Sequence, residues 1–264
     1  MKAVVVGGTG AVGREIVLQL LASDKWASVT TVGRRPLDAP AAAAESTAAG
    51  ARALFSTPER AAAAGKKLRH VDAPDVEDLP AGAFAGADAV FCALGTTRGD
   101  AGSAEAFLRV DLGGVRAAVA AANGGGAANA NAAGAAQQPR RPRFFGLVSA
   151  SGANSALPAP RFVGLHPLLY SQTKGAAEDS VREAAFESAS AYRPGLLSRG
   201  AKARAIERVL WLIPVVPRIA VANVARVAVA DAERALAQEG GRGWRVYDMV
   251  SLLVASGKEP PALN

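Results

Sequence analysis

Residues 3–13 read Ala-Val-Val-Val-Gly-Gly-Thr-Gly-Ala-Val-Gly, and no other segment constrains the architecture as strongly. A short β-branched apolar run that ends in glycines predicts a buried parallel strand. Apolar residues then recur at helical spacing over residues 13–21, and residues 28–32 form a second strand-like run. Strand, glycine turn, helix and strand within about 30 residues predict a βαβ unit.

The glycine turn has the spacing G-x-x-G-x-x-G, with glycines at positions 7, 10 and 13. Gly7 permits a tight turn, Gly10 lets backbone N–H groups approach a pyrophosphate, and Gly13 lets the helix pack close to the strand. The helix N-terminus then faces the anion. A glycine-rich turn without a ligand is the alternative, but the turn lies between a strand and a helix, as the motif requires. We therefore predict a dinucleotide site made by Gly7, Thr9, Gly10, Ala11, Val12 and Gly13.

Strand-like and helix-like segments alternate along the rest of the chain. Further strands are predicted near residues 68–71, 87–94, 144–149, 188–192 and 244–247. Helices are predicted over residues 104–122, 170–186 and 219–236. This alternation predicts an α/β fold, a Rossmann-type doubly wound parallel sheet with a small C-terminal substrate-side region.

A single NAD(P)-binding domain is expected over residues 1–264. Two low-complexity insertions interrupt it: an alanine-rich stretch at 40–65, read as one padded helix, and a surface loop at 123–143. Residues 196–264 form the predicted substrate-side lobe. Within it, residues 209–217 are strongly apolar, and a substrate lid, a dimer contact and a membrane-touching surface remain alternatives for them.

Composition excludes several classes of function. The 264 residues carry a net charge of +7, which favours anionic partners, but the basic residues are scattered and no aromatic-rich basic stripe points to nucleic acid. One cysteine, Cys92, rules out an intramolecular disulfide, and with only His70 and His166 as histidines no metal site is expected. Cys92 is read as a buried apolar residue. No secretory signal or transmembrane segment is visible, so a cytoplasmic location is expected.

The residues after the second strand bear on the choice of cofactor. NAD-binding proteins usually carry an acidic residue there to accept a bond from the ribose 2′-hydroxyl. This chain instead has Gly33-Arg34-Arg35. Arginines suit a 2′-phosphate, which they bind by charge and bidentate hydrogen bonds. We predict NADP(H) as the cofactor, with a pair of solvated surface arginines as the alternative.

Tyr170 and Lys174 lie four residues apart at the start of a predicted helix and therefore share a face. An ammonium close to a phenol favours the phenolate, so the pair suits proton exchange with a carbonyl or alcohol while nicotinamide exchanges a hydride. Ser149 ends the preceding strand and is the predicted hydroxyl partner, with Ser151 as a competitor. Tyr170, Lys174 and Ser149 are the candidate catalytic residues.

The set resembles the short-chain dehydrogenase/reductase superfamily. Three further segments are similar to the Tat-interacting oxidoreductase family, whose members are atypical short-chain dehydrogenases that bind NADPH. These segments read FCALGTTRG at residues 91–99, LRVD at 108–111 and YRPGLL at 192–197. The resemblance covers residues 3–235 apart from the two insertions.

The resemblance implies a role for several residues. Leu94, Gly95 and Thr96 would line the cofactor, Lys174 would also bind the nicotinamide ribose, and Pro194 to Leu197 would form a wall at the nicotinamide end. Asp72 would accept a bond from the adenine amine. Asp111 departs from the wider superfamily, in which many members carry asparagine in a proton relay.

Three functions follow as hypotheses. The first is an NADPH-dependent oxidoreductase acting on a small, apolar carbonyl compound or alcohol, with Tyr170 as the proton donor or acceptor. The second is an NADPH-binding regulatory or scaffold protein with little turnover, acting through a protein partner or as a homodimer. The third is a sugar-nucleotide epimerase or dehydratase, which shares the fold but usually has a larger C-terminal domain.

Overall fold

The computed structural model describes residues 1–46, 48–96, 98–124, 140–158, 167–198, 218–237 and 243–257. Their centre is a seven-stranded parallel sheet in the order β3-β2-β1-β4-β5-β6-β9. The strands are β1 (Lys2–Val6), β2 (Ser28–Gly33), β3 (Leu68–Asp72), β4 (Ala89–Cys92), β5 (Phe144–Val148), β6 (Ser188–Tyr192) and β9 (Gly243–Tyr247). This order reverses next to β1, as in doubly wound dinucleotide-binding sheets, so the predicted fold class is confirmed.

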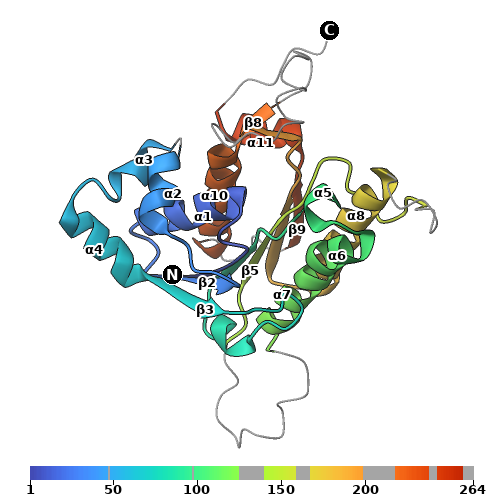
Figure 1. The fold of residues 1–264 in the computed structure, drawn as a ribbon, viewed down its shortest axis with the longest axis horizontal. Coiled ribbons are helices and arrows are strands. Elements are labelled where there is room, and N and C mark those ends of the chain that lie inside the picture. Colours follow the sequence, from blue (N-terminus) through green and yellow to red (C-terminus); the bar gives the residue numbers. More distant parts are fainter. Residues whose placement is uncertain are drawn as a thin grey trace, which may run out of the picture.

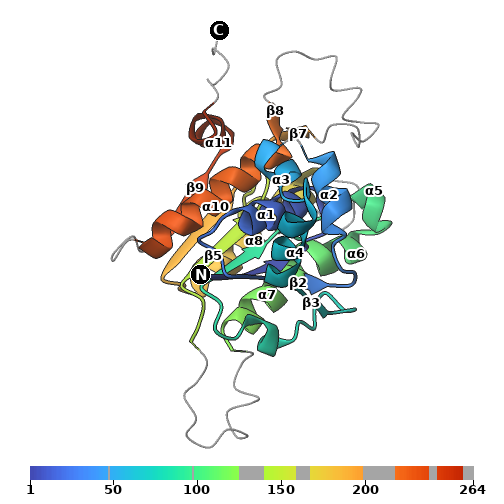
Figure 2. The same ribbon diagram turned by 90° about the vertical axis from the view of Figure 1, so that its left-hand side faces the viewer.

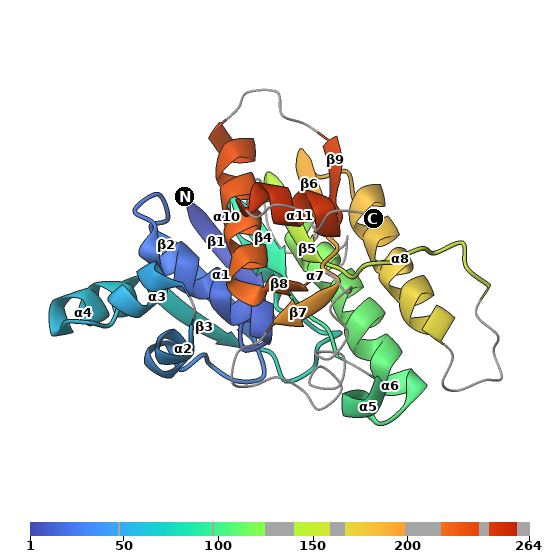
Figure 3. The same ribbon diagram turned by 90° about the horizontal axis from the view of Figure 1, so that it is seen from above.

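Helices cover both faces of the sheet, which lies between them in Figures 1 and 3. One face carries α1 (Ala11–Ala22) and α10 (Val221–Ala237), which pack against each other, and α10 also packs on β5 and β6. The other face carries α7 (Gly114–Ala122) and α8 (Pro167–Glu183). The side view shows α10 running alongside α1 (Figure 2).

The central strands are apolar because both their faces are covered. Residues 3–6 of β1 and all of β4 are buried. Val5 and Phe91 join the core beneath α1 and α10, whereas Val4 and Val90 join the core beneath α7 and α8. The strand alternation thus sends successive side chains into two separate cores. This explains why β1 and β4 show no polar alternation in sequence.

The alanine-rich region 40–65 differs from the expected single helix. It holds α2 (Ala39–Glu45), α3 (Ala49–Ala53) and α4 (Pro58–Lys67). Asp38 and Thr57 act as N-caps, and Pro40 and Pro58 stand in the first turns of α2 and α4. Caps and prolines favour new helix starts, which divide the alanine-rich stretch.

The helix predicted over residues 104–122 is also divided. It consists of α6 (Ala104–Leu108), a π-turn η2 (Arg109–Gly113) and α7. Single π-turns inside helices are frequent at functional sites. The other helical segments are η1 (Ala81–Phe84), α5 (Arg98–Ala101) and α11 (Met249–Ala255), and β7 (Leu196–Ser198) pairs with β8 (Arg218–Ala220) in a small parallel sheet.

A buried carboxylate ties α10 to the last two strands. Asp231 is 1% exposed and accepts hydrogen bonds from Ser190 Oγ at 2.7 Å, Tyr192 Oη at 2.9 Å and Tyr247 Oη at 2.8 Å. The two tyrosine rings stack with centroids 5.4 Å apart. Burial, and then the charge of Asp231, raises the pKa of Tyr192 well above its ordinary value.

Replacement of Asp231 by alanine is expected to lower the free energy of unfolding by about 3 kcal/mol, because two buried hydroxyls and one half-buried hydroxyl lose this acceptor. Urea denaturation of the full chain measures this. Asp72→Ala is the matched control: its side chain is 84% exposed, so a change within about 0.5 kcal/mol is expected. Equal effects of the two replacements would contradict a stabilising role for the buried cluster.

Candidate nucleotide and proton-transfer site

The glycine turn joins β1 to α1 with the geometry that its spacing predicts. Gly7 has a φ of +79°, which side chains rarely adopt, and its carbonyl accepts the Gly10 N–H at 3.0 Å. A Cβ atom on Gly13 would lie 2.2 Å from the Gly7 carbonyl oxygen. Only glycine fits there without moving the backbone, so the close packing expected of Gly13 is present.

The N-terminus of α1 is suited to an anion. Gly10 is the N-cap, and no side chain of the described residues caps it. The first N–H groups of this 12-residue helix, at Ala11, Val12 and Gly13, lack intrahelical partners and carry the positive end of the helix dipole. A dinucleotide pyrophosphate fits this donor set.

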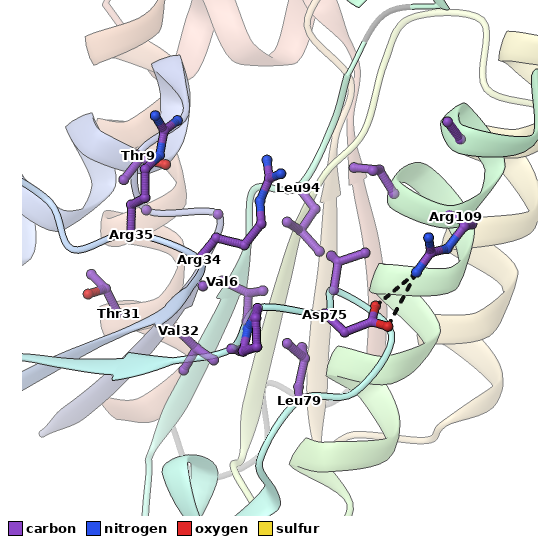
Figure 4. A pocket seen from close by; sticks show the side chains of 18 residues that line it. Val6, Thr9, Thr31, Val32, Arg34, Arg35, Asp75, Leu79, Leu94 and Arg109 are labelled. Carbon is purple, nitrogen blue, oxygen red and sulfur yellow. Dashed lines mark hydrogen bonds and ion pairs between the residues drawn. The ribbon is translucent and has the colours of Figure 1, made fainter. Parts of the chain in front are cut away.

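A pocket of about 510 Å³ opens beside the turn, at the carboxyl ends of β1, β2 and β3. Figure 4 shows its lining residues. Of the predicted cofactor residues, those that line it are Gly7, Thr9, Arg34, Arg35 and Leu94. An apolar part of the pocket wall is formed by Val32, Val76 and Leu79. An apolar pocket between strand ends and a glycine turn suits the adenosine part of a dinucleotide.

Arg34 and Arg35 extend from the turn after β2, and both line the pocket (Figure 4). Both side chains are exposed, and neither pairs with an acidic side chain of the described residues. Guanidinium groups are the donors that suit a phosphate, so these two side chains match the predicted preference for a 2′-phosphate without testing it.

The adenine contact expected of Asp72 stays a prediction. The Asp72 side chain is 84% exposed, does not line the pocket, and lies 3.3 Å from His70 Nε2. Residues 70 and 72 point to the same side of β3 because side chains alternate along a strand. Asp75, three residues further on, is the carboxylate that lines the pocket, and it pairs with Arg109 at 3.1 Å (Figure 4).

Tyr170 and Lys174 occupy successive turns of α8, as predicted. The Tyr170 ring stacks on the buried Phe107 of α6 with centroids 5.8 Å apart. Lys174 is buried, and its Nζ lies 2.7 Å from Asp111 Oδ1 in η2. A Cβ atom on Gly95 would lie 3.3 Å from the same Nζ, so the loop after β4 passes directly over the ammonium.

The second oxygen of Asp111 accepts the Thr96 N–H at 2.9 Å. Burial alone would lower the pKa of Lys174, but the charge of Asp111, and then that of Tyr170, raises it above its ordinary value. Lys174 therefore carries a positive charge at neutral pH although it has little access to water.

Ser149 is buried, and its hydroxyl is hydrogen-bonded to Glu178 rather than to Tyr170. Its hydroxyl donates to Glu178 Oε1 at 2.5 Å, and Arg193 binds both oxygens of Glu178 at 2.9 and 2.6 Å. Glu178 lies two turns beyond Tyr170 on α8, about 12 Å along the axis. The structure shows no hydrogen bond between Ser149 and Tyr170. Ser149 directly follows β5, at the strand end where the sequence analysis placed it. Its side-chain rotamer is set by the hydrogen bond to the Glu178 carboxylate, which the sequence analysis did not consider. The exposed Ser151 remains the alternative hydroxyl.

The remaining predicted residues lie around this group. Pro194 is buried, its carbonyl accepts the Ser151 N–H at 3.0 Å, and Leu197 in β7 packs against the core. Cys92 is fully buried in β4, and burial raises the pKa of its thiol to about 11. No cluster of metal-ligating side chains occurs among the described residues. His166, residues 209–217 and most of the 123–143 loop lie outside the residues that the structure describes.

Sequence reasoning missed three carboxylates: Asp75 at the pocket, Glu178 beside Ser149, and Asp111 as the partner of Lys174. Glu178 follows Lys174 by four residues, so helical spacing alone could have placed it on the face of Tyr170 and Lys174. Asp111 was noted as a departure from a family pattern, but its ion pair depends on a π-turn that no sequence periodicity predicts.

Together these features define a class. The sheet order, the glycine turn at an uncapped helix N-terminus and the Tyr–Lys helix are those of a dinucleotide-binding protein of the short-chain dehydrogenase/reductase type.

Comparison with known proteins supports this class. A family described as NAD(P)H-binding matches residues 39–234. The rat protein HTATIP2 is 30% identical over 193 residues, which are 73% of this chain and 61% of the relative. The mitochondrial protein FMP52 of Candida albicans is 29% identical over 199 residues, 75% of this chain and 67% of the relative. The chain belongs to the NAD(P)H-binding family, and the predicted membership of the short-chain dehydrogenase/reductase superfamily is confirmed.

Solved structures share the fold. MoeE5 in complex with UDP-glucose and NAD superposes with a TM-score of 0.60 at 19% identity, covering 98% of this chain and 83% of that protein. Vestitone reductase from alfalfa superposes with a TM-score of 0.58 at 18% identity, covering 94% and 76%. At these identities the likeness concerns the fold alone.

Among the described residues, no helix has the length and apolar character that spanning a membrane requires.

Proposed function

We propose that this protein is an NADP(H)-dependent oxidoreductase that interconverts a small carbonyl compound and its alcohol. The observation that carries the proposal is the arrangement on α8. Tyr170 and the buried, charged Lys174 share one helix face, and Lys174 lies against Gly95 in the loop after β4. That loop continues from Leu94, which lines the nucleotide pocket.

Each group of residues would have a separate role. The free N–H groups of α1 would bind the pyrophosphate, Arg34 and Arg35 the 2′-phosphate, and Lys174 the nicotinamide ribose. Tyr170 would give a proton to the substrate oxygen during reduction and accept it during oxidation. Bound nicotinamide would supply or accept the hydride. The Phe107 ring beside Tyr170 favours an apolar substrate.

An NADPH-binding regulatory protein with little turnover is the second candidate. Two observations favour it: the Ser149 hydroxyl is committed to Glu178, and Asp111 offsets the charge of Lys174. This candidate keeps nucleotide binding and predicts no substrate. The cytoplasmic location expected from the sequence stays a prediction, and the fungal relatives carry the word mitochondrial in their names.

The test is an equilibrium titration of the purified chain with NADPH and with NADH, followed by nicotinamide fluorescence. Selective binding of NADPH is expected. A panel of small aldehydes and ketones is then added, and the loss of reduced nicotinamide is followed by absorbance. Binding without oxidation of NADPH by any panel member would favour the regulatory candidate. Binding of neither nucleotide would reject both.

A further inference from the structure

One wall of the nucleotide pocket is formed by residues 73–79, here called the wall segment, which lies between β3 and η1 and contains neither helix nor strand. The members that line the pocket are Ala73, Pro74, Asp75, Val76 and Leu79. Arg34 lies on the other side of the pocket (Figure 4). Because an irregular segment lacks a regular ladder of backbone hydrogen bonds, its position depends on the contacts that other elements supply.

Arg109 supplies the charged contacts to the wall segment. It is the first residue of the π-turn η2, and its Nε donates to Glu77 Oε2 at 2.8 Å. Its Nη2 donates to both oxygens of Asp75, at 3.1 and 3.3 Å (Figure 4). Asp75 Oδ1 also accepts the Glu77 N–H at 3.0 Å. One planar guanidinium therefore holds two carboxylates of a single turn in a fixed geometry.

The end of the same π-turn packs closely against the wall segment. A Cβ atom on Gly113 would lie 2.1 Å from Glu77 Oε1. A Cβ atom on Gly114, the next residue, would lie 2.6 Å from Val76 Cγ2 and 2.8 Å from Leu94 Cδ1. Glycine at both positions leaves the space that these side chains occupy. Val76 and Leu94 line the pocket, so this packing shapes the pocket on that side.

A direct contact with a nucleotide phosphate is the alternative role for Arg109, because Arg109 also lines the pocket. Two observations weigh against it. Two nitrogen atoms of the guanidinium already bind carboxylates, so Asp75 and Glu77 offset its charge. The Asp75 carboxylate belongs to the same wall, and it would repel a phosphate there. The contacts therefore favour an action of Arg109 through the wall segment.

We propose that Arg109 is a positioning residue for nucleotide binding, which holds the wall segment against the adenosine half of the nucleotide through its ion pairs with Asp75 and Glu77. Glu77 shares this role although it does not line the pocket. The inference rests on the nucleotide site of the proposed function. It involves neither Tyr170 nor turnover.

Glu77→Gln separates the two roles of Arg109. If Arg109 positions the wall segment, this change weakens the binding of NADPH and NADH alike, by about threefold, as expected for the loss of one exposed ion pair. If Arg109 binds a phosphate, its release from Glu77 leaves the affinity for NADPH unchanged or raises it. Nicotinamide fluorescence titration measures both affinities, and melting curves show that the variant is folded.

Arg109→Ala removes both ion pairs and is expected to weaken the binding of both nucleotides by about tenfold. The double variant Glu77→Gln/Arg109→Ala should also lose about tenfold, rather than the roughly thirtyfold of independent effects, because the two residues act through one interaction. Calorimetric titration with adenosine 2′,5′-bisphosphate, the adenosine half of NADPH, should show the same factors. Arg109→Lys keeps the charge and one carboxylate contact, and it should recover most of the affinity.

Arg116→Ala is the matched control, because Arg116 is an exposed arginine of α7 that does not line the pocket. It should leave both affinities within about twofold. Unchanged or tighter binding in Glu77→Gln, independent effects in the double variant, or an unchanged affinity for adenosine 2′,5′-bisphosphate would overturn the inference. A parent chain that binds neither nucleotide would overturn it together with the proposed function. A chain that shows these losses but oxidises no NADPH would reject the proposed function and leave the inference standing.

Discussion

Tyr170→Phe is expected to reduce the oxidation of NADPH by the best carbonyl substrate by about 10²–10⁴-fold, the range that a general acid usually contributes. The change removes one hydroxyl and leaves the ring, which stacks on Phe107, in place. NADPH affinity should stay within about threefold of the parent, because the nucleotide pocket contains no atom of Tyr170. Steady-state turnover and fluorescence titration of the same preparation measure the two quantities.

Ser149→Ala is the informative companion variant. Its hydroxyl binds Glu178, which keeps both bonds from Arg193, so the expected loss is about 1 kcal/mol of folding stability and less than tenfold in turnover. A loss as large as that of Tyr170→Phe would restore the catalytic role that the sequence suggested for Ser149. Unchanged turnover in Tyr170→Phe would show that another group donates the proton.

The nucleotide-binding half of the molecule was predictable because local rules determine it. The apolar run 3–6, the glycine turn and the helix from Ala11 follow from residue size and backbone freedom within a few residues. The pairing of β1 with both β2 and β4 then follows from the usual topology of such units. The arginines at positions 34 and 35 reach the pocket simply because they follow β2.

The proton-transfer half was predictable only in part, because its contacts join distant segments. Helical spacing placed Tyr170 and Lys174 on one face, but the partner of Lys174 lies 63 residues away in a π-turn. Ser149 occupies the expected strand end, yet its rotamer depends on Glu178. Asp72 lies at the expected strand end too, but it points to His70. Sequence position predicted which segment each residue joins, whereas the directions of the Lys174 and Ser149 side chains depend on carboxylates contributed by other elements.

The nucleotide-binding half and the proton-transfer half meet at one loop. The loop 94–96 contacts both: Leu94 lines the nucleotide pocket, Gly95 lies over Lys174 and the Thr96 N–H binds Asp111. The loop therefore joins the nucleotide pocket to the ion pair between Lys174 and Asp111. Cofactor choice is the second property for which a large effect is expected.

Replacing Arg34 and Arg35 together by alanine is expected to weaken NADPH binding by about 10²-fold or more, while NADH binding changes less than about threefold. Each charge-assisted hydrogen bond contributes about 1.5–3 kcal/mol, and exposure of both side chains places the sum near the lower end. NADPH differs from NADH only by the 2′-phosphate. A selective loss of NADPH binding therefore identifies the 2′-phosphate as the group that the arginines bind.

Arg69→Ala is the matched control, because Arg69 is an exposed arginine of the neighbouring strand β3 that does not line the pocket. It removes one exposed positive charge, where the double variant removes two, and it should leave both affinities within about twofold, since a screened surface charge acts weakly at a distance. An equal loss of NADPH and NADH affinity in the double variant would mean that the arginines support the pocket rather than the phosphate. Equal affinity of the parent for both nucleotides would reject NADP(H) selectivity, and the two guanidinium groups would then be solvated surface charges.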